Sequence, residues 1–228
     1  MSDKFNKIYE QSINNPEKFW SEAANDIFWF KKPTKILNKS NPPFYKWYED
    51  GVTNTCYNAL DIHIDQGNGK RTALIYDSPI TGNKSKFTYE ELRSKVSKFA
   101  GALKDQGVNK GDRVIIYMPM IPEAVVAMLA CARIGAIHSV VFGGFASNEL
   151  ASRIDDSKAK VLVTASCGFE PGRTVEYKPL VDEAIKLANH KIDKMILFQR
   201  SGHEVKLNAP KEVSWEEVVS KANEVDCV

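Results

Sequence analysis

The stretch that most constrains the fold covers residues 112–145. It contains two short apolar runs, 113–118 and 137–142, and between them an almost entirely apolar segment, 124–132. Pro122 suits the first position of a helix, because its missing N–H would have no intrahelical partner there. Two apolar strands joined through a helix are expected to pair in parallel. The stretch therefore predicts a strand–helix–strand unit.

The rest of the chain repeats this alternation. Further short apolar runs at 73–76, 160–164 and 194–198 predict strands. Four further helices are predicted: Thr88, Ser147 and Ser214 are expected as N-caps of three of them, and Pro179 as the first residue of the fourth. Regular alternation of this kind predicts an α/β fold with a doubly wound, mostly parallel sheet flanked by helices.

Two of these helix starts have a capping-box pattern. Thr88 is followed three residues later by Glu91, and Ser214 by Glu217. In such a box the hydroxyl accepts from the backbone N–H of the glutamate, and the glutamate accepts from the backbone N–H of the capping residue. Apolar residues at helical spacing follow Thr88, so this helix is the most clearly marked in the sequence.

The first part of the chain has a different character. Residues 1–58 show no alternation of strands and helices and predict a helical and irregular N-terminal arm, with 59–228 as an α/β unit. The arm is rich in aromatic residues, including the run 28–30. These aromatics could form a platform for a ligand, but a role in holding the arm against a larger body is favoured.

Composition and charge exclude several classes. The chain has 31 Lys and Arg against 29 Asp and Glu, so there is no basic field for nucleic acid. The segment 124–132 is too short for a membrane span, which needs about 20 residues. The N-terminus lacks an apolar signal region. We expect no nucleic-acid or membrane partner and a cytoplasmic location, with the mitochondrial matrix left open.

The cysteines do not form a recognisable motif. They are widely spaced without a CxxC pair, and we expect reduced thiols and no metal site. The four are Cys56, Cys131, Cys167 and Cys227. His138 lies in an apolar run, where a hydrogen-bonded core histidine is a better interpretation than a base or a ligand.

Two loops follow predicted strands at their carboxyl ends, where open α/β sheets bind ligands. One contains Gly143 and Gly144. Because glycine has no side chain, the backbone there could approach a ligand closely, or the two glycines could simply form a packing turn. The other runs through Pro171 and Gly172 to Arg173, whose planar guanidinium suits a phosphate. The pattern alone predicts no more than a possible nucleotide-like ligand.

Several longer segments together resemble a known family. The stretch 111–145 and the sequences EPGR and KPLVDEAI, beginning at Glu170 and Lys178, resemble the short-chain acyl-CoA synthetases, the AMP-forming acetate and propionate CoA ligases of the adenylate-forming superfamily. Segments 54–61 and 87–92 are similar to the same family. Ile62 departs from it, since an arginine is usual there, and this puts one local contact in doubt.

The resemblance implies a two-step reaction. ATP and a carboxylic acid form an acyl-adenylate, and the thiol of coenzyme A then displaces AMP, with Mg²⁺ offsetting the charge of the phosphates. In this family the phosphate loop, the acyl pocket and the catalytic lysine come later in the chain than the residues present. The resemblance therefore implies a first subdomain that ends before the phosphate loop, has no catalytic or metal-binding residue and requires no cofactor by itself.

The resemblance does imply part of the coenzyme A site. The segment that holds the nucleotide end of coenzyme A, and the loop beside it, correspond to Glu170, Pro171, Gly172 and Arg173 and to Gly143 and Gly144. The partners expected of the whole protein are small molecules: a short-chain acid, ATP and coenzyme A.

Two hypotheses remain open from the sequence. The chain ends in the middle of the alternating pattern, which predicts the N-terminal part of a longer ligase. The alternative is a naturally truncated, non-catalytic module that binds coenzyme A or a protein. The acid is not defined by these residues, although the run after Arg173 slightly favours propionate over acetate.

Overall fold

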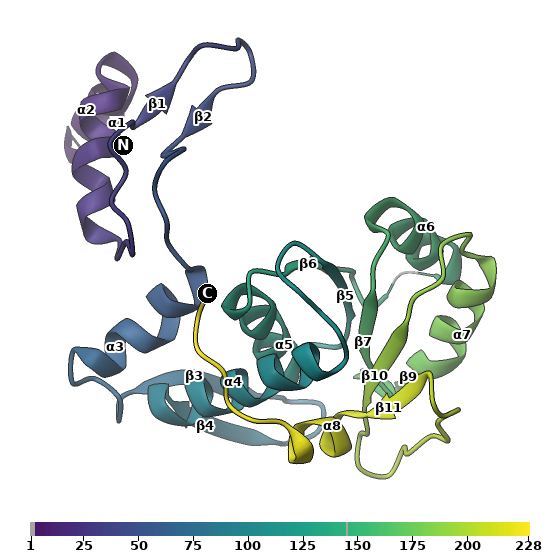
Figure 1. The fold of residues 1–228 in the computed structure, drawn as a ribbon. Coiled ribbons are helices and arrows are strands. Elements are labelled where there is room, and N and C mark those ends of the chain that lie inside the picture. The colour runs from purple at the N-terminus through teal and green to yellow at the C-terminus, as the bar shows by residue number, and fades with distance from the viewer. Residues whose placement is uncertain (1–2, 145) are drawn as a thin grey trace. The chain divides into compact units, whose positions relative to one another are not determined.

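The computed structural model describes residues 3–144 and 146–228. The chain divides into two compact units, Met1–Asn54 and Thr55–Val228. Each unit is built from its own elements, which Figure 1 labels along the chain. The assignment of 1–58 as an arm and 59–228 as an enzyme subdomain stays a prediction.

The first unit is helical at its start and irregular afterwards. Its elements are α1 (Asp3–Asn14), α2 (Pro16–Ala23), the 3₁₀ turn η1 (Ala24–Asp26) and the antiparallel pair β1 (Leu37–Asn38) and β2 (Lys46–Trp47). Aromatic groups tie these pieces together. Trp20 and Trp47 meet edge to face, and the Tyr48 hydroxyl donates to the Trp20 carbonyl at 2.8 Å. Within this unit the aromatic side chains therefore contact one another.

The second unit contains, in its described residues, a five-stranded parallel sheet. The spatial order is β11-β10-β7-β5-β6, so the winding reverses between β5 and β7. The strands are β5 (Arg113–Tyr117), β6 (Ile137–Val140), β7 (Val161–Ala165), β10 (Lys194–Phe198) and β11 (Glu212–Ser214). The doubly wound sheet predicted from the alternation is confirmed.

Helices cover both faces of this sheet, and each face has its own apolar core (Figure 1). One face carries α4 (Tyr89–Asp105), α5 (Pro122–Arg133) and α8 (Trp215–Lys221), and the other carries α6 (Ser147–Ser157) and α7 (Tyr177–Leu187). Phe99 of α4 stacks on Trp215 of α8 with 3.6 Å between ring centroids. No residue of α5 is exposed, as the apolar run 124–132 within it predicts.

Smaller elements surround the sheet. A helical stretch, η2 (Tyr57–Asp61), runs into α3 (Ile62–Asp65), and two antiparallel hairpins form separate two-stranded sheets. The first hairpin pairs β3 (Thr72–Asp77) with β4 (Lys84–Thr88), and the second pairs β8 (Cys167–Glu170) with β9 (Arg173–Glu176).

The helix starts agree only in part with the sequence. The capping box at Thr88 is complete, because its hydroxyl accepts from the Glu91 N–H and its own N–H donates to the Glu91 carboxylate at 2.8 Å. Ser214 accepts from the N–H of Glu217 but donates to Glu216, so only half of the second box forms.

Two other predicted starts are wrong. Helix α6 has Ala146 at its N-cap, without a side-chain hydrogen bond, and Ser147 is already its first residue. Helix α7 begins at Tyr177, two residues before Pro179. A proline in the first turn removes no intrahelical hydrogen bond, so the helix can begin before it.

The edge strand β6 also differs from its prediction. His138 is exposed, whereas its apolar neighbours predicted a core histidine, and Ile137 and Val140 are each 55% exposed. Strand β6 pairs on one side only, with β5, so apolar sequence here does not mean burial on both faces. Of the described helices, none has the length and apolar character that crossing a membrane requires.

Candidate functional site

A pocket of about 390 Å³ lies at the carboxyl edge of the sheet. We call it the edge pocket. The β3–β4 hairpin closes one side, and the other walls come from the ends of β5 and β6, from the β8–β9 hairpin that follows β7, and from the residue two positions after β10. These are the strands on either side of the point where the winding reverses, which is where ligands bind in open α/β sheets. The topology, rather than any single motif, therefore places this pocket.

Gly143 and Gly144 lie in the turn after β6 and line the edge pocket. A Cβ atom added to Gly143 would collide with the ring of Tyr177, and one added to Gly168 would lie 2.9 Å from the Tyr177 hydroxyl oxygen. The hydroxyl of Tyr117 donates to the Gly143 carbonyl at 3.3 Å. Packing around Tyr177 thus accounts for the glycine at 143, which is the packing interpretation of this loop.

Tyr117 and Tyr177 form the floor under this turn. Their ring centroids are 4.9 Å apart, and both side chains are buried. Burial raises the pKa of the Tyr177 hydroxyl to about 12 and that of Tyr117 above its ordinary value. Both hydroxyls therefore stay protonated at neutral pH, and they can serve as hydrogen-bond donors.

The segment Glu170 to Arg173 is a hairpin tip and not a loop. Strands β8 and β9 pair antiparallel, with Glu170 opposite Arg173, and Pro171 and Gly172 are the two residues of the turn. Gly172 has φ +76°, a conformation that favours glycine, and proline fixes φ near −65° at the position before it. This pairing of proline and glycine suits a type II turn.

Glu170 and Arg173 form an ion pair across the tip. Arg173 Nη2 lies 2.7 Å and Nε 2.8 Å from Oε2 of Glu170, and the two side chains are 71% and 43% exposed for Arg173 and Glu170. Glu170 lines the edge pocket, whereas Arg173 does not. The structure therefore brings Gly143, Gly144 and Glu170 to one pocket and places Arg173 outside its wall.

A second arginine, which no sequence motif marks, also belongs to this site. Arg200 lines the edge pocket, and its guanidinium lies over the ring of Phe169, 4.6 Å from the centroid. Its backbone N–H donates to the Ser166 hydroxyl at 2.9 Å. Arg200 follows strand β10 at its carboxyl end, so the rule that singled out the other two loops applies to it as well. The pocket therefore has a cationic group of its own.

A doubly wound parallel sheet with a pocket at its switch point defines an α/β domain suited to a small-molecule ligand. Residues 63–227 match the family model described as AMP-binding enzyme, and residues 5–59 match the one described as acetyl-coenzyme A synthetase N-terminus. The chain belongs to the AMP-binding enzyme family.

Curated relatives agree with this assignment. The chain is 53% identical over 221 residues to "Acyl-CoA synthetase short-chain family member 3, mitochondrial" of Homo sapiens, covering 96% of this chain and 32% of the relative. It is 46% identical over 215 residues to the acetyl-coenzyme A synthetase of Streptomyces avermitilis, covering 94% and 33%. The chain thus spans about a third of their length. The predicted resemblance to short-chain acyl-CoA synthetases is confirmed.

A solved structure shows the same fold. The acetoacetyl-CoA synthetase from Streptomyces lividans superposes with a TM-score of 0.83 over 96% of this chain and 33% of that one, at 24% identity. The α/β fold class predicted from the alternation is therefore found in a solved relative.

Proposed function

We propose that the chain is the N-terminal part of an ATP-dependent, AMP-forming ligase. This ligase joins a short-chain carboxylic acid, propionate or acetate, to coenzyme A through an acyl-adenylate. The observation that carries the proposal is the pair of family matches, which together span nearly the whole chain, with relatives named for this kind of synthetase.

The chain's own share of the activity is part of the coenzyme A site. The hairpin tip of Glu170, Pro171, Gly172 and Arg173 holds the nucleotide end of coenzyme A, with Gly143 and Gly144 beside it. Within the tip Arg173 makes the phosphate contact, and Glu170 is its partner when no ligand is bound. Arg173 supports this role because its guanidinium is exposed at the tip of a short hairpin, where only one carboxylate competes for it. A guanidinium binds phosphate with two parallel hydrogen bonds, and a phosphate dianion attracts it more strongly than one carboxylate does.

Arg200 adds a second cationic contact to this proposal. Its stacking on Phe169 keeps the guanidinium plane in place, so little rotamer freedom remains to be lost on binding. Phe169 belongs to β8, the strand that leads to the hairpin tip, so Arg200 lies beside the same hairpin as Arg173. We expect Arg200 to face the part of coenzyme A that enters the edge pocket.

ATP and Mg²⁺ belong to the complete enzyme. In the reaction proposed, Mg²⁺ neutralises phosphate charge during adenylate formation. We assign no residue of this chain to either, and we expect the 228-residue chain alone to form no acyl-adenylate. For the whole protein we propose a location in the cytoplasm or the mitochondrial matrix, as in the relative named mitochondrial.

The test is a product assay on the intact protein. Acetate or propionate is supplied with ATP and Mg²⁺, with and without coenzyme A, and AMP, ADP, pyrophosphate and thioester are measured. We expect AMP, pyrophosphate and acyl-CoA in equal amounts. ADP and phosphate in their place would exclude an adenylate. Coenzyme A binding without any thioester product would favour a non-catalytic binding module.

A further inference from the structure

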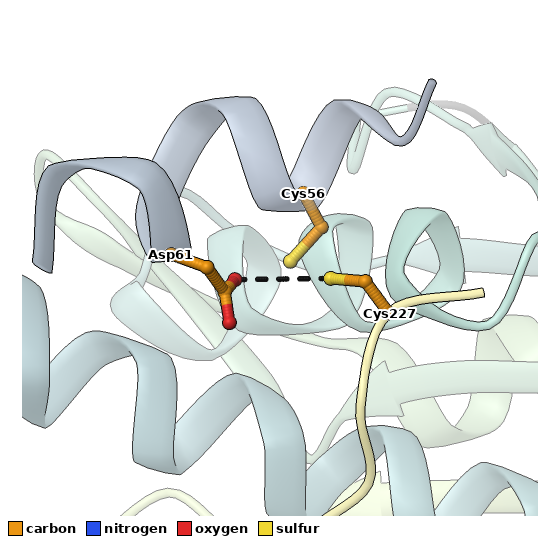
Figure 2. Close-up of side chains that lie close together, drawn as sticks. All are labelled: Cys56, Asp61 and Cys227. Carbon is orange, nitrogen blue, oxygen red and sulfur yellow. Dashed lines mark hydrogen bonds between the residues drawn. The ribbon is translucent and has the colours of Figure 1, made fainter. Parts of the chain in front are cut away.

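Two cysteines that are far apart in the sequence meet in the second unit, on the side of the sheet covered by α4 and α5. Cys56 lies just before η2, and Cys227 lies near the other end of the unit. Their sulfur atoms and a carboxylate oxygen of Asp61 are all within 4.8 Å of one another. Figure 2 shows the three side chains pointing toward one another from two segments of the chain.

Arg133, the last residue of α5, holds this cluster together. Its guanidinium binds Asp61 with two hydrogen bonds, of 2.8 and 3.0 Å. The same Nη1 lies 3.1 Å from Cys227 Sγ and 3.6 Å from Cys56 Sγ. The side chain of Arg133 is only 3% exposed. Both sulfur atoms therefore lie beside a guanidinium that is itself paired with Asp61, and the Cys227 thiol donates to the same carboxylate at 3.7 Å (Figure 2). The arginine favours a thiolate, and the Asp61 carboxylate opposes it.

Cys227 belongs to a segment, 222–228, that lies along helix α4 and reaches the beginning of η2 (Figure 1). We call this segment the strap. Backbone groups of Val225 bond to the Ser97 hydroxyl at 2.6 and 2.9 Å and to Arg133 Nε at 2.6 Å. These contacts fix the strap on both sides of Cys227, since the N–H of Val228 donates to the Arg133 carbonyl at 3.0 Å.

The two thiols differ in their surroundings. Cys56 is fully buried, and its pKa lies below the ordinary value because of a hydrogen bond from Cys227 and because Arg133 is close. Cys227 is partly exposed, and its pKa is raised because it gives that hydrogen bond and because it is buried in part. Of the two thiols, Cys56 is thus the more readily ionised, and Cys227 is the one open to solvent.

A metal ion is a poor occupant of this cluster. A dication held by the two sulfurs and Asp61 would lie next to the guanidinium of Arg133, which already takes both carboxylate oxygens. The dication and the guanidinium would repel each other in a buried environment, where water and salt screen charges only weakly. The positive charge that opposes a metal favours a thiolate, and a thiolate beside a second thiol is the arrangement from which disulfides form.

We propose that Cys56 and Cys227 form a reversible disulfide that ties the strap to the start of η2, with a peroxide or a small-molecule disulfide as the oxidant. This is independent of the proposed ligase activity. The sulfurs, now within 4.8 Å of each other, must approach to about 2.05 Å. The link would close a loop that contains almost the whole second unit, and long loops lose the most unfolded-state freedom when closed.

The chemistry balances with hydrogen peroxide. The thiolate of the pair attacks one peroxide oxygen, the O–O bond breaks, and a sulfenic acid and hydroxide form. The second sulfur then attacks the sulfenic sulfur, so that an S–S bond forms, the S–O bond breaks, and the oxygen leaves as water. Two thiols and one peroxide thus give one disulfide and two waters. Oxidised glutathione acts instead by thiol–disulfide exchange and releases two reduced glutathiones.

The test is a redox titration of the intact protein, which is first analysed for bound metal. Samples equilibrated in glutathione buffers of increasing oxidised fraction are blocked with iodoacetamide, digested without reductant and searched by mass spectrometry for a peptide joining Cys56 to Cys227. We expect this peptide to replace the two alkylated ones as the buffer becomes oxidising, and to disappear again on reduction.

Three variants serve as controls. Cys56→Ser and Cys227→Ser should abolish the link. Cys131→Ser should leave it unchanged, because Cys131 is buried in α5 and burial raises its pKa to about 12. The linked peptide is detected directly in the wild-type protein. The test therefore remains valid even if one of the variants fails to fold. Oxidised wild-type protein should also melt at a higher temperature than reduced protein, and Cys227→Ser should show no such difference.

Three results would overturn the proposal. One is that both thiols remain alkylated in a fully oxidising buffer while circular dichroism shows folded protein. Another is that Cys227 accumulates a glutathione adduct without any internal link. The third is one zinc ion per protein whose removal by a chelator is needed before either thiol reacts, which would make the cluster a metal site.

Discussion

Two arginine–carboxylate pairs in the second unit have similar contact distances and opposite surroundings. Asp61 and Arg133 are joined by bonds of 2.8 and 3.0 Å, and Glu170 and Arg173 by bonds of 2.7 and 2.8 Å. The first pair is 3% and 11% exposed at Arg133 and Asp61, whereas Arg173 is 71% exposed. Contact distance therefore does not tell what a pair does.

The two pairs differ in what can take the place of the carboxylate when the arginine loses it. At the hairpin tip, water or a phosphate can take the place of the Glu170 carboxylate, so the pair stabilises little and can exchange. Beside α5 nothing can replace Asp61, and a lone charge left there would be costly. The buried pair belongs to the framework of the fold, and the exposed pair is the one suited to a ligand.

The largest effect is expected for the buried pair. Arg133→Met should lower the free energy of unfolding by about 3–5 kcal/mol, because Asp61 is left as an unpaired buried charge. Arg173→Met, the same substitution at the exposed pair, should change it by less than about 0.5 kcal/mol. Urea unfolding followed by circular dichroism measures both. Equal losses in the two variants would refute the contrast.

An intermediate effect is expected at the base of the hairpin. Gly168→Ala should cost about 1–3 kcal/mol, because the new methyl group would press on the buried Tyr177 ring. The same unfolding experiment measures this cost. If the substitution left the free energy of unfolding unchanged, the base of the hairpin would be as free to adjust as its tip. Rigidity of the surroundings would then not distinguish the exposed Glu170–Arg173 pair from the buried Asp61–Arg133 pair.

The smallest effect is expected for the acid of the exposed pair. Glu170→Gln keeps a polar group beside Arg173 and removes the competing charge, worth about 0.2–1 kcal/mol in an exposed pair. The KM for coenzyme A should therefore fall a few-fold in the intact enzyme. Steady-state kinetics with coenzyme A varied would show it. A tenfold rise would mean instead that Glu170 itself binds the ligand.

Much of the fold followed from local pattern. Strands β5, β7 and β10 are apolar runs between turns, and the box at Thr88 depends on residues three apart, so each can be recognised without knowing the tertiary structure. The hairpin was missed because Cys167 to Arg173 has no apolar alternation and its turn looked like a loop. Ser147 and Pro179 were misplaced because either can also stand inside a first turn.

Less of the candidate site than of the fold could be predicted from the sequence. The rule that ligands bind beyond the carboxyl ends of strands found the glycine turn and the hairpin tip, and it could have found Arg200. No spacing rule brings Cys56 to Cys227 or Asp61 to Arg133, because these contacts depend on how α5, η2 and the strap pack. Packing against Tyr177 accounts for Gly143. That Gly143 and Gly144 also contact a ligand stays a prediction.

The most direct test of the account is the kinetics of Arg173→Ala in the intact enzyme. Coenzyme A is varied at saturating ATP and acid, and acid-dependent exchange of pyrophosphate into ATP is measured in parallel. Loss of one charge-assisted phosphate contact, about 1.5–3 kcal/mol, should raise the KM for coenzyme A roughly ten- to a hundredfold and leave the exchange rate nearly unchanged. An unchanged KM with impaired exchange would contradict the account and make Arg173 a support of the adenylation step.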